Sequence, residues 1–497
     1  MMGVFDGLDV IDLSTGIAGP MTAMMLVDNG ARVTRVDLPG ARSEPRASGR
    51  RVWMRGMRSA ALDLEIPADR EVARTLAQRA DIVIESFAPG VAARHGLDHD
   101  ALAATNRRVI TCSISGYGTL RAHQGRPVED ALAAARTGLL YDQKGRRGTV
   151  MEFINGRPGP VPEFGAPDGL VRGADRDGPV FPGTPWPSIG AMYHAALGIA
   201  AALHVREITG LGQHVTTSLL QGALAAATLN WQRVEHPDAP LYWMWPVDAR
   251  SIEGLYECAD GRWVHHWTVR PAWVLASAEG DELREVELGT QYRDDPDRLG
   301  MEPDDLISGM FLHPLLAEAF AKFPSDEWVR AGARAGVGIA LVRSPTEALA
   351  DESFRADGCV VEVDDAEMGP IRHIGPALEF SATPGAVRGT APRCGAHTDD
   401  VRAEAARGFT PDETPAPRGG AIAHPLDGIR VIDLGLGVAG PFTGRALADL
   451  GADVIKIHAL HDGFWTGTHM GLGTNRGKRS LAINLKDPRG RAALDAL

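Results

Sequence analysis

The stretch Gly7-Leu-Asp-Val-Ile-Asp-Leu-Ser-Thr-Gly-Ile-Ala-Gly-Pro20 decides the fold of this chain. Its apolar run predicts a buried strand, its glycines predict a tight turn, and Pro20 suits the first turn of a helix. Asn29-Gly30 is a helix stop signal, and residues 31–36 have the pattern of the next strand. A strand, turn, helix and strand in this order predict a βαβ unit of a parallel sheet, with backbone N–H groups of the turn available to an anion.

The same stretch occurs a second time, as Gly428-Ile-Arg-Val-Ile-Asp-Leu-Gly-Leu-Gly-Val-Ala-Gly-Pro441. Residues 7–64 and 428–485 align without a gap, and about a third of the positions are identical. A repeat of this length is a domain rather than a solenoid period. We therefore expect one complete unit in residues 1–407, a Pro/Gly linker at 408–424, and the start of a second, incomplete unit at 425–497.

Further strand and helix patterns alternate along the first unit. Strands are expected at 60–64, 81–85, 109–115 and 213–218, and helices at 69–79, 189–207 and up to 229. This alternation predicts an α/β fold with an open, doubly wound parallel sheet, a Rossmann-like large domain whose ligands bind at the carboxyl ends of the strands. We assign residues 1–229 to its N-terminal part, 230–330 to a smaller, tryptophan-rich α+β domain, and 331–407 to a segment that completes the large domain.

Composition excludes several classes of partner. The net charge is −13 and no basic run interleaved with aromatic residues is present, so we expect neither nucleic acid nor a membrane as partner. We find no apolar run of transmembrane length and no leader pattern, which predicts a cytoplasmic protein. The four cysteines are far apart, so we expect reduced, mostly buried thiols and no metal site.

Residues 39–60 are expected to form a loop that is rich in arginine. In an acidic protein such a loop is either a solvated charged segment or a polyanion site beside the glycine turn, and the sequence leaves both open. The arginines are Arg42, Arg46, Arg50, Arg51, Arg55 and Arg58.

An ordered set of short motifs resembles one known family, the class III CoA-transferases of the CaiB/BaiF type. Each motif alone is weak, but together they span residues 1–405 in the order that the family has. They are Asp12-Leu13, Ala18-Gly19-Pro20, Gly30-Ala31, Glu85-Ser-Phe-Ala-Pro-Gly90 with Arg94, Ser113-Ile-Ser-Gly-Tyr-Gly118, Gly198-Ile-Ala-Ala-Ala-Leu203, Thr209-Gly-Leu-Gly-Gln213 and Gly395-Ala-His-Thr-Asp399, with Asn475-Arg-Gly-Lys-Arg-Ser480 in the second copy.

The resemblance implies a large nucleotide-binding-like domain, a small domain, and a dimer of two ring-like subunits that interlock; a second repeat could replace the second subunit as a pseudo-dimer. It also implies the chemistry. An aspartate attacks an acyl-CoA to give a mixed anhydride and free CoA thiolate. The thiolate then attacks the aspartyl carbonyl, which forms an enzyme-bound aspartyl-CoA thioester and releases the acyl group as its carboxylate, and a second carboxylic acid finally takes the CoA. CoA and acyl-CoA are substrates, and no covalently bound cofactor is expected.

The resemblance assigns roles to individual residues of this chain. The family's nucleophile position is occupied by Ser188, and Asp130 matches an acidic position near the active site. A serine ester has no carboxyl carbon that CoA could attack, so the first copy is expected to be inactive unless another carboxylate moves in; the candidates are Asp168, Asp175 and Asp177. The implied CoA-binding residues are Thr15, Gly16, Ile17, Ala18, Leu62, Phe87 and Arg94.

Two positions weaken the expected CoA site, and they lead to two hypotheses. Leu38 and Glu65 stand where the family has basic residues, whereas the second copy has Lys486 in place of Glu65. The first hypothesis is a tandem CoA-transferase, like the fused dimethylsulfoniopropionate CoA-transferase/lyase type, in which the first copy is a structural pseudo-subunit and the second carries its nucleophile near position 609. A chain of 497 residues would then be truncated and inactive by itself. The alternative is a non-catalytic acyl-CoA-binding or interaction subunit.

Overall fold

The computed structural model describes residues 3–40, 48–120, 123, 125–142, 183–227, 255–267, 317–335, 338–408, 422–460, 462 and 469–497. The chain divides into two compact units. One comprises Met1–Leu139, Pro182–Tyr242 and Leu349–Leu497, and the other comprises Leu140–Phe181 and Trp243–Ala348. The domain boundaries expected from the sequence stay predictions.

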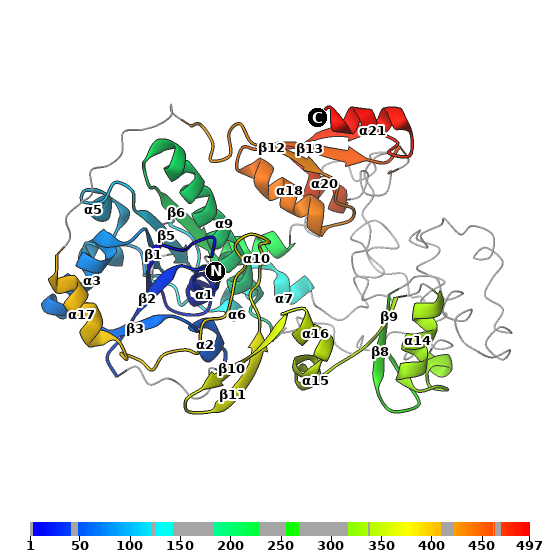
Figure 1. The fold of residues 1–497 in the computed structure, drawn as a ribbon, viewed down its shortest axis with the longest axis horizontal. Coiled ribbons are helices and arrows are strands. Elements are labelled where there is room, and N and C mark those ends of the chain that lie inside the picture. Colours follow the sequence, from blue (N-terminus) through cyan, green and yellow to red (C-terminus); the bar gives the residue numbers. More distant parts are fainter. Residues whose placement is uncertain are drawn as a thin grey trace, which may run out of the picture. The chain divides into compact units, whose positions relative to one another are not determined.

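The larger unit is built on a six-stranded parallel sheet (Figure 1). Its strands lie in the order β3-β2-β1-β4-β5-β6, and every neighbouring pair is parallel. The order reverses direction between β1 and β4, which opens a crevice at the carboxyl ends of these strands. The predicted α/β fold with a parallel sheet is thereby confirmed. The strands are β1 (Asp9–Leu13), β2 (Arg32–Asp37), β3 (Arg58–Ala61), β4 (Ile82–Glu85), β5 (Ile110–Ser115) and β6 (His214–Ser218).

Helices cover both faces of this sheet, because alternate strand residues point to opposite sides. Val10 and Ile82 belong to the core that α1 (Ala18–Asp28) and α9 (Trp186–Thr209) complete. Ile11 and Val83 belong to the opposite core. That core is closed by α3 (Pro67–Arg79), α5 (His99–Ala103) and α17 (Thr398–Ala406).

Shorter elements complete the larger unit. A helix and a strand lie where residues 39–60 were expected to be a loop, so this prediction is wrong for 48–53 and 58–60, and the strand expected at 60–64 ends at Ala61. Strand β3 begins at Arg58, which pairs in parallel with Thr34. The polar residues Arg58 and Ser59 gave no strand pattern in the sequence. The remaining elements of this unit are α2 (Ser48–Trp53), α4 (Val91–His95), α6 (Asp130–Thr137), α10 (Leu219–Ala227), α16 (Glu352–Ala356) and the antiparallel pair β10 (Val360–Asp365) and β11 (Gly369–Ile374). Two short helices, α7 (Leu139–Asp142) and α15 (Pro345–Ala350), have residues in both units.

Three arginines of residues 39–60 serve the fold rather than an anion. Arg51 pairs with Asp365 at 2.7 Å. Arg55 is fully buried, grips the Asp28 carboxylate with two nitrogens, and donates to backbone carbonyls. Arg58 pairs with Glu404 at 3.0 Å. The hypothesis of a polyanion site is therefore wrong for these arginines.

The smaller unit contains a three-stranded antiparallel sheet in the order β7-β8-β9. It comprises β7 (Leu255–Glu257), β8 (Trp263–Trp267) and β9 (Gly338–Leu341), with α14 (Ser325–Ala335) packed on it. Its core is aromatic. Tyr256 stacks on Phe320 with ring centroids 4.4 Å apart, and Phe320 also contacts the Trp328 ring at a centroid distance of 4.4 Å.

Residues 422–497 repeat the first elements of the chain at a constant offset. Each element begins 421 positions after its counterpart, as Ala439 follows Ala18, and β12 pairs with β13 in the register of β1 with β2. The described residues contain three helices here, and one of them, α20, corresponds to α2, which the sequence pattern did not indicate. The elements are β12 (Arg430–Asp433), α18 (Ala439–Asp449), β13 (Asp453–His458), α20 (His469–Asn475), β14 (Arg479–Ala482) and α21 (Pro488–Asp495).

Among the described residues, one helix, α9, is long and apolar enough to cross a membrane by length and composition alone. The expectation that no such stretch exists is therefore wrong on these two criteria. The helix packs against α1, α10, β5 and β6 of the large sheet, which is the position of a core helix. The cysteine expectation is correct for half of the thiols: Cys112 and Cys258 are buried, whereas Cys359 is exposed and Cys394 is half-buried.

Candidate functional site

The turn between β1 and α1 is held from two sides. Asp12 accepts hydrogen bonds from the Ser14 backbone N–H at 2.9 Å and from its hydroxyl. The Thr15 N–H donates to Ser86 Oγ at 2.6 Å, so this amide is already occupied and is not free for an anion as the sequence had indicated. Gly16 follows with φ +76°, a conformation that a residue with a Cβ rarely adopts.

A buried charge network lies under this turn. The Arg35 guanidinium contacts Asp12 at 2.6 Å and Asp37 at 3.1 Å, and it also donates to the Ser14 carbonyl. All three charged side chains are at least nine-tenths buried. The arginine is thus saturated by its own carboxylates, which makes it a support of the turn and leaves it little capacity for a ligand.

A cavity of about 520 Å³, here called the strand-end pocket, opens at the carboxyl ends of β1, β2, β3 and β4. This is the place where a parallel sheet with this strand order binds its ligand. Five of the seven predicted binding residues line the pocket: Thr15, Gly16, Leu62, Phe87 and Arg94. The other two do not: Ile17 is the N-cap residue of α1, and Ala18 is buried in the core.

Leu38 and Glu65, which the sequence had placed at the expected CoA site, also line the pocket, but much of the lining was missed by sequence reasoning. The missed apolar groups come from Leu13, Val36, Trp53, Met54, Leu64 and Val91, and the missed polar ones from Ser14, Arg35, Asp37, Asp63 and His95. One signal could have found the strand-borne members, because residues that end neighbouring parallel strands meet at one edge of a sheet. Trp53 and Met54 could not be found in this way, since α2 was not expected.

The most exposed cation of the pocket is engaged by a carboxylate. Arg94 NH2 lies 2.9 Å from Glu65 Oε1, and His95 Nε2 lies 3.6 Å from the same oxygen. Asp63, two residues before Glu65, accepts the Glu65 backbone N–H at 2.9 Å. The pocket wall therefore carries Arg35 and Arg94 against Asp37, Asp63 and Glu65, which is an acidic balance for a ligand with phosphates.

Another carboxylate closes the end of β4. Glu85 accepts hydrogen bonds from the Phe87 N–H at 2.6 Å and from the Ser113 hydroxyl on β5. Burial raises the pKa of this carboxyl. Glu85 therefore fixes the turn that presents Phe87 to the strand-end pocket.

Ser188, at the position where the resemblance expects a nucleophile, and Asp130 lie together at the start of α9. Ser188 is buried, and Asp130 at the start of α6 accepts both its backbone N–H, at 2.8 Å, and its hydroxyl, at 2.7 Å. The helix begins Trp186-Pro187, so Ser188 offers an early N–H that has no partner within the helix. Asp130 thus acts as a helix cap from a distance, and both of its oxygens are occupied. Asp168, Asp175 and Asp177 lie outside the described residues.

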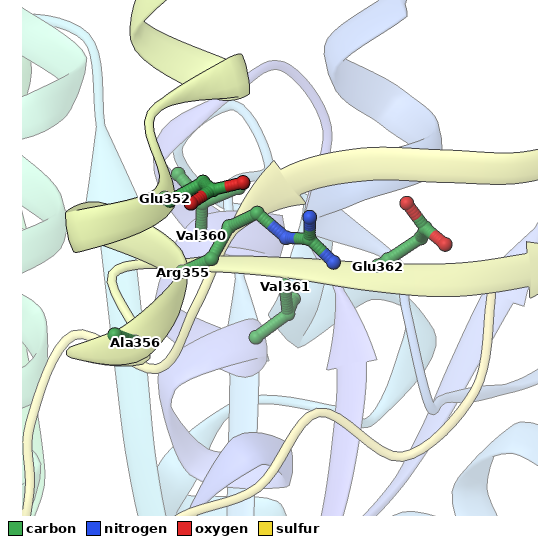
Figure 2. A pocket seen from close by; sticks show the side chains of 6 residues that line it. All are labelled: Glu352, Arg355, Ala356, Val360, Val361 and Glu362. Carbon is green, nitrogen blue, oxygen red and sulfur yellow. The ribbon is translucent and has the colours of Figure 1, made fainter.

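A further hollow of about 550 Å³ shares no residue with the strand-end pocket. It is lined by Glu352, Arg355, Ala356, Val360, Val361 and Glu362. Figure 2 shows Arg355 reaching from α16 along β10 in the direction of Glu362, which already pairs with Arg372 at 2.8 Å. None of the residues predicted for function lies there. Among the described side chains, no group of three or more His, Cys, Asp or Glu is placed to hold a metal ion.

The second copy places different charges at the equivalent positions. Asn484 accepts the Lys486 N–H at 3.0 Å, as Asp63 accepts that of Glu65. The equivalents of Arg35 and Asp37 are Lys456 and His458. The backbone arrangement is thus repeated, while Asp37, Asp63 and Glu65 of the first copy are replaced by neutral or basic residues.

Known proteins match this chain over most of its length. It is 27% identical to the CoA-transferase/lyase DddD of Marinomonas sp., over 99% of this chain and 61% of that protein, so it spans about three fifths of that relative. It is 29% identical to the acetyl-CoA:oxalate CoA-transferase of Acetobacter aceti, over 70% of this chain and 82% of that enzyme. A crystal structure of a CAIB/BAIF family protein from Brucella suis shares the fold, with a TM-score of 0.62, 22% identity, and coverage of 82% of this chain and 100% of that one. The model of CoA-transferase family III matches residues 5–398 and again 426–497. The chain belongs to CoA-transferase family III.

Proposed function

We propose that this chain comes from a tandem CoA-transferase that moves CoA between an acyl-CoA and a carboxylic acid, and that its first copy is a non-catalytic partner of the second. Residues 1–407 form the first copy, and residues 425–497 begin the second. The exchange through an aspartyl-CoA intermediate then belongs to the second copy, where the position equivalent to Ser188 lies beyond Leu497.

The observation that carries this proposal is the state of Ser188. Its hydroxyl and backbone N–H are both bound to Asp130. CoA exchange needs a carboxylate, because the thiolate must attack the carbonyl carbon of a side-chain anhydride and expel the acyl group's carboxylate. An acylated serine contains only the acyl carbonyl, so attack on it by CoA merely regenerates the starting thioester.

Two further observations support the tandem arrangement. The elements of residues 422–497 repeat those of the first copy at one offset and in one strand register. A family relative that is a CoA-transferase/lyase aligns with 99% of this chain and is longer than it. Two family domains in one polypeptide could assemble as the pseudo-dimer that the family's interlocked subunits suggest.

The first copy retains a place for CoA. The strand-end pocket combines apolar walls, an aromatic ring from Phe87 and the exposed Arg94, which suits a nucleotide with a pantetheine arm. Its acidic balance predicts weak binding. The occupied hydroxyl of Ser188 favours a second candidate function for this copy, that of a non-catalytic acyl-CoA-binding or interaction subunit.

A trapping experiment tests the proposal. The purified 497-residue chain is incubated with acetyl-CoA or succinyl-CoA, treated with hydroxylamine, and its peptides are analysed by mass spectrometry. We expect no aspartyl or glutamyl hydroxamate, whereas a family enzyme that has the aspartate gives one under the same conditions. A hydroxamate on Asp130, Asp168, Asp175 or Asp177 would overturn the proposal and identify the carboxylate that replaces the missing nucleophile.

A further inference from the structure

The Glu65–Arg94 ion pair is too exposed to contribute much to the stability of the fold, but it lies in the strand-end pocket. The two side chains are 71% and 63% exposed, and their atoms are 2.9 Å apart. Pairs this exposed contribute little to the free energy of folding, because water screens both charges. Their position matters more, since both residues line the strand-end pocket.

Glu65 binds the Arg94 guanidinium, which is the cation that a phosphate in the pocket would use. Arg35, the other arginine of the pocket, is bound to Asp12 and Asp37 and is buried. Any phosphate that contacts Arg94 must therefore compete with the Glu65 carboxylate, and it must also approach Asp63 in the same turn. The repulsion between a phosphate and these carboxylates is stronger in a partly closed pocket than in water.

The second copy shows that the turn itself does not require these acids. Asn484 and Lys486 form the same side-chain-to-backbone hydrogen bond as Asp63 and Glu65, at 3.0 Å and 2.9 Å. Both turns lead into a helix that begins with proline, Pro67 and Pro488. The charge at these positions thus varies while the local backbone hydrogen bond remains.

We propose that Glu65 is a resident anion of the strand-end pocket, a specificity-determining residue that holds Arg94 and so makes the first copy discriminate against phosphorylated ligands. This inference rests on the proposed function, because it assumes that CoA is the ligand class of the pocket. Ligands without phosphate, such as a nucleoside, escape the discrimination, since they need neither Arg94 nor the removal of Glu65.

Calorimetry on the full chain tests this with CoA and adenosine as ligands and Glu65→Gln as the variant. Neutralising Glu65 frees Arg94 and removes one repulsive charge, so CoA should bind about tenfold more tightly, with a gain that shrinks as salt is added. Adenosine affinity should stay unchanged. The double variant Asp63→Asn/Glu65→Lys, which carries the charges of the second copy, should gain more for CoA than Glu65→Gln.

Two controls isolate the pocket. Glu71 forms a similarly exposed pair with Arg74, at 3.3 Å and outside the pocket, so Glu71→Gln should leave both affinities at the wild-type value. Adding Arg94→Ala to Glu65→Gln should remove the part of the gain that acts through Arg94 and leave only the part that comes from the lost repulsion. CoA binding elsewhere on the chain, including residues 425–497, does not depend on Glu65 and cancels in these comparisons.

Three outcomes would overturn the inference. If wild type binds CoA and Glu65→Gln binds it equally, the resident-anion role fails while CoA binding by the first copy stands. An equal gain for CoA and adenosine would show a change of pocket shape rather than a release of charge. If neither wild type nor any variant binds CoA, the inference fails together with the proposed CoA site.

Discussion

At the residue scale, the substitution that restores the family's carboxylate should harm the protein. Ser188→Asp places a second carboxylate against Asp130, whose oxygens lie 2.8 and 2.7 Å from the serine N–H and hydroxyl. Two carboxylates this close cannot both stay ionised, and the hydroxyl hydrogen bond is lost. We expect a loss of about 2 kcal/mol or more in the free energy of unfolding, measured by urea denaturation at pH 7.

A second variant separates charge from shape. Asp130→Asn added to Ser188→Asp removes the repulsion and keeps a similar side-chain volume, so it should recover most of the loss. Ser188→Ala, which only deletes the hydroxyl, should cost about 1 kcal/mol. If Ser188→Asp is as stable as wild type, Asp130 does not hold Ser188 in the way that the hydrogen bonds indicate.

Sequence reasoning at this scale succeeded where residues follow one another and failed where strands bring them together. Thr15, Gly16 and Phe87 were implied by motifs that are continuous in the chain and resemble those of the family, and they line one pocket. Arg35 and His95 were not, because their contacts with Asp12 and Glu65 connect separate elements. The spacing of residues along the chain does not predict such contacts between separate elements.

At the scale of elements, the two copies solve the same burial problem differently. Asp12 at the end of β1 is paired by Arg35 of β2 at 2.6 Å. Its counterpart Asp433 is paired by Lys478, 2.8 Å away, and Lys456, the counterpart of Arg35, lies farther off at 3.8 Å. Met57, which is buried, occupies the position of Lys478 in the first copy, so Arg35 compensates there for the missing lysine. A guanidinium can reach two carboxylates at once, whereas an ammonium acts as a point charge.

Strand β8 of the smaller unit carries a histidine that should make this unit sensitive to acid. His266 is buried beside Tyr256 and Phe320, and neither of its ring nitrogens has a hydrogen-bond partner among the described residues. Burial lowers the pKa of His266 from 6.5 to about 4. The unfolded chain therefore takes up a proton at a higher pH than the folded one does. Stability is full above pH 6.5 and falls as the pH drops toward 4, by on the order of 3 kcal/mol from this residue.

Urea unfolding between pH 4 and 8, followed by tryptophan fluorescence, measures this loss. His266→Phe keeps an aromatic ring and cannot be protonated, so the transition of the smaller unit should lose much of its dependence on pH below 6.5. A variant that keeps the wild-type pH profile would show that other groups cause the acid sensitivity.

Element types were predicted more easily than their ends. Apolar residues dominate the buried strand β4 and recur in β1 and β5, and the structure places these strands within one or two residues of the expectation. Helix α2 and its counterpart α20 were both missed, because six residues with two arginines and seven residues with two glycines show no apolar periodicity. Tertiary contacts stabilise α2 instead: Trp53 and Val52 pack against the core of α1.

At the scale of the whole molecule, the described part of the second copy is a sheet with an unfinished edge. Strand β1 lies between β2 and β4, whereas its counterpart β12 pairs only with β13 among the described residues. Three of the four β12 residues are half-buried or exposed, and Leu434 and Leu436, which follow the strand, are 54% and 74% exposed. An edge strand with few buried contacts opens more easily than a central one.

We therefore expect hydrogen exchange to separate the two copies. Amides of Val431–Leu434 should exchange much faster than those of Val10–Leu13, although both segments have nearly the same sequence, because only the latter have partners on both sides. Limited proteolysis should cut first between Gly408 and Ala423, because this stretch has the Pro/Gly composition of a linker, and it should leave residues 1–405 intact. Mass spectrometry of deuterated peptides measures the first effect directly. Equal protection of the two strands would mean that the free edge of β12 is covered in solution and that residues 425–497 are an integral part of the folded chain.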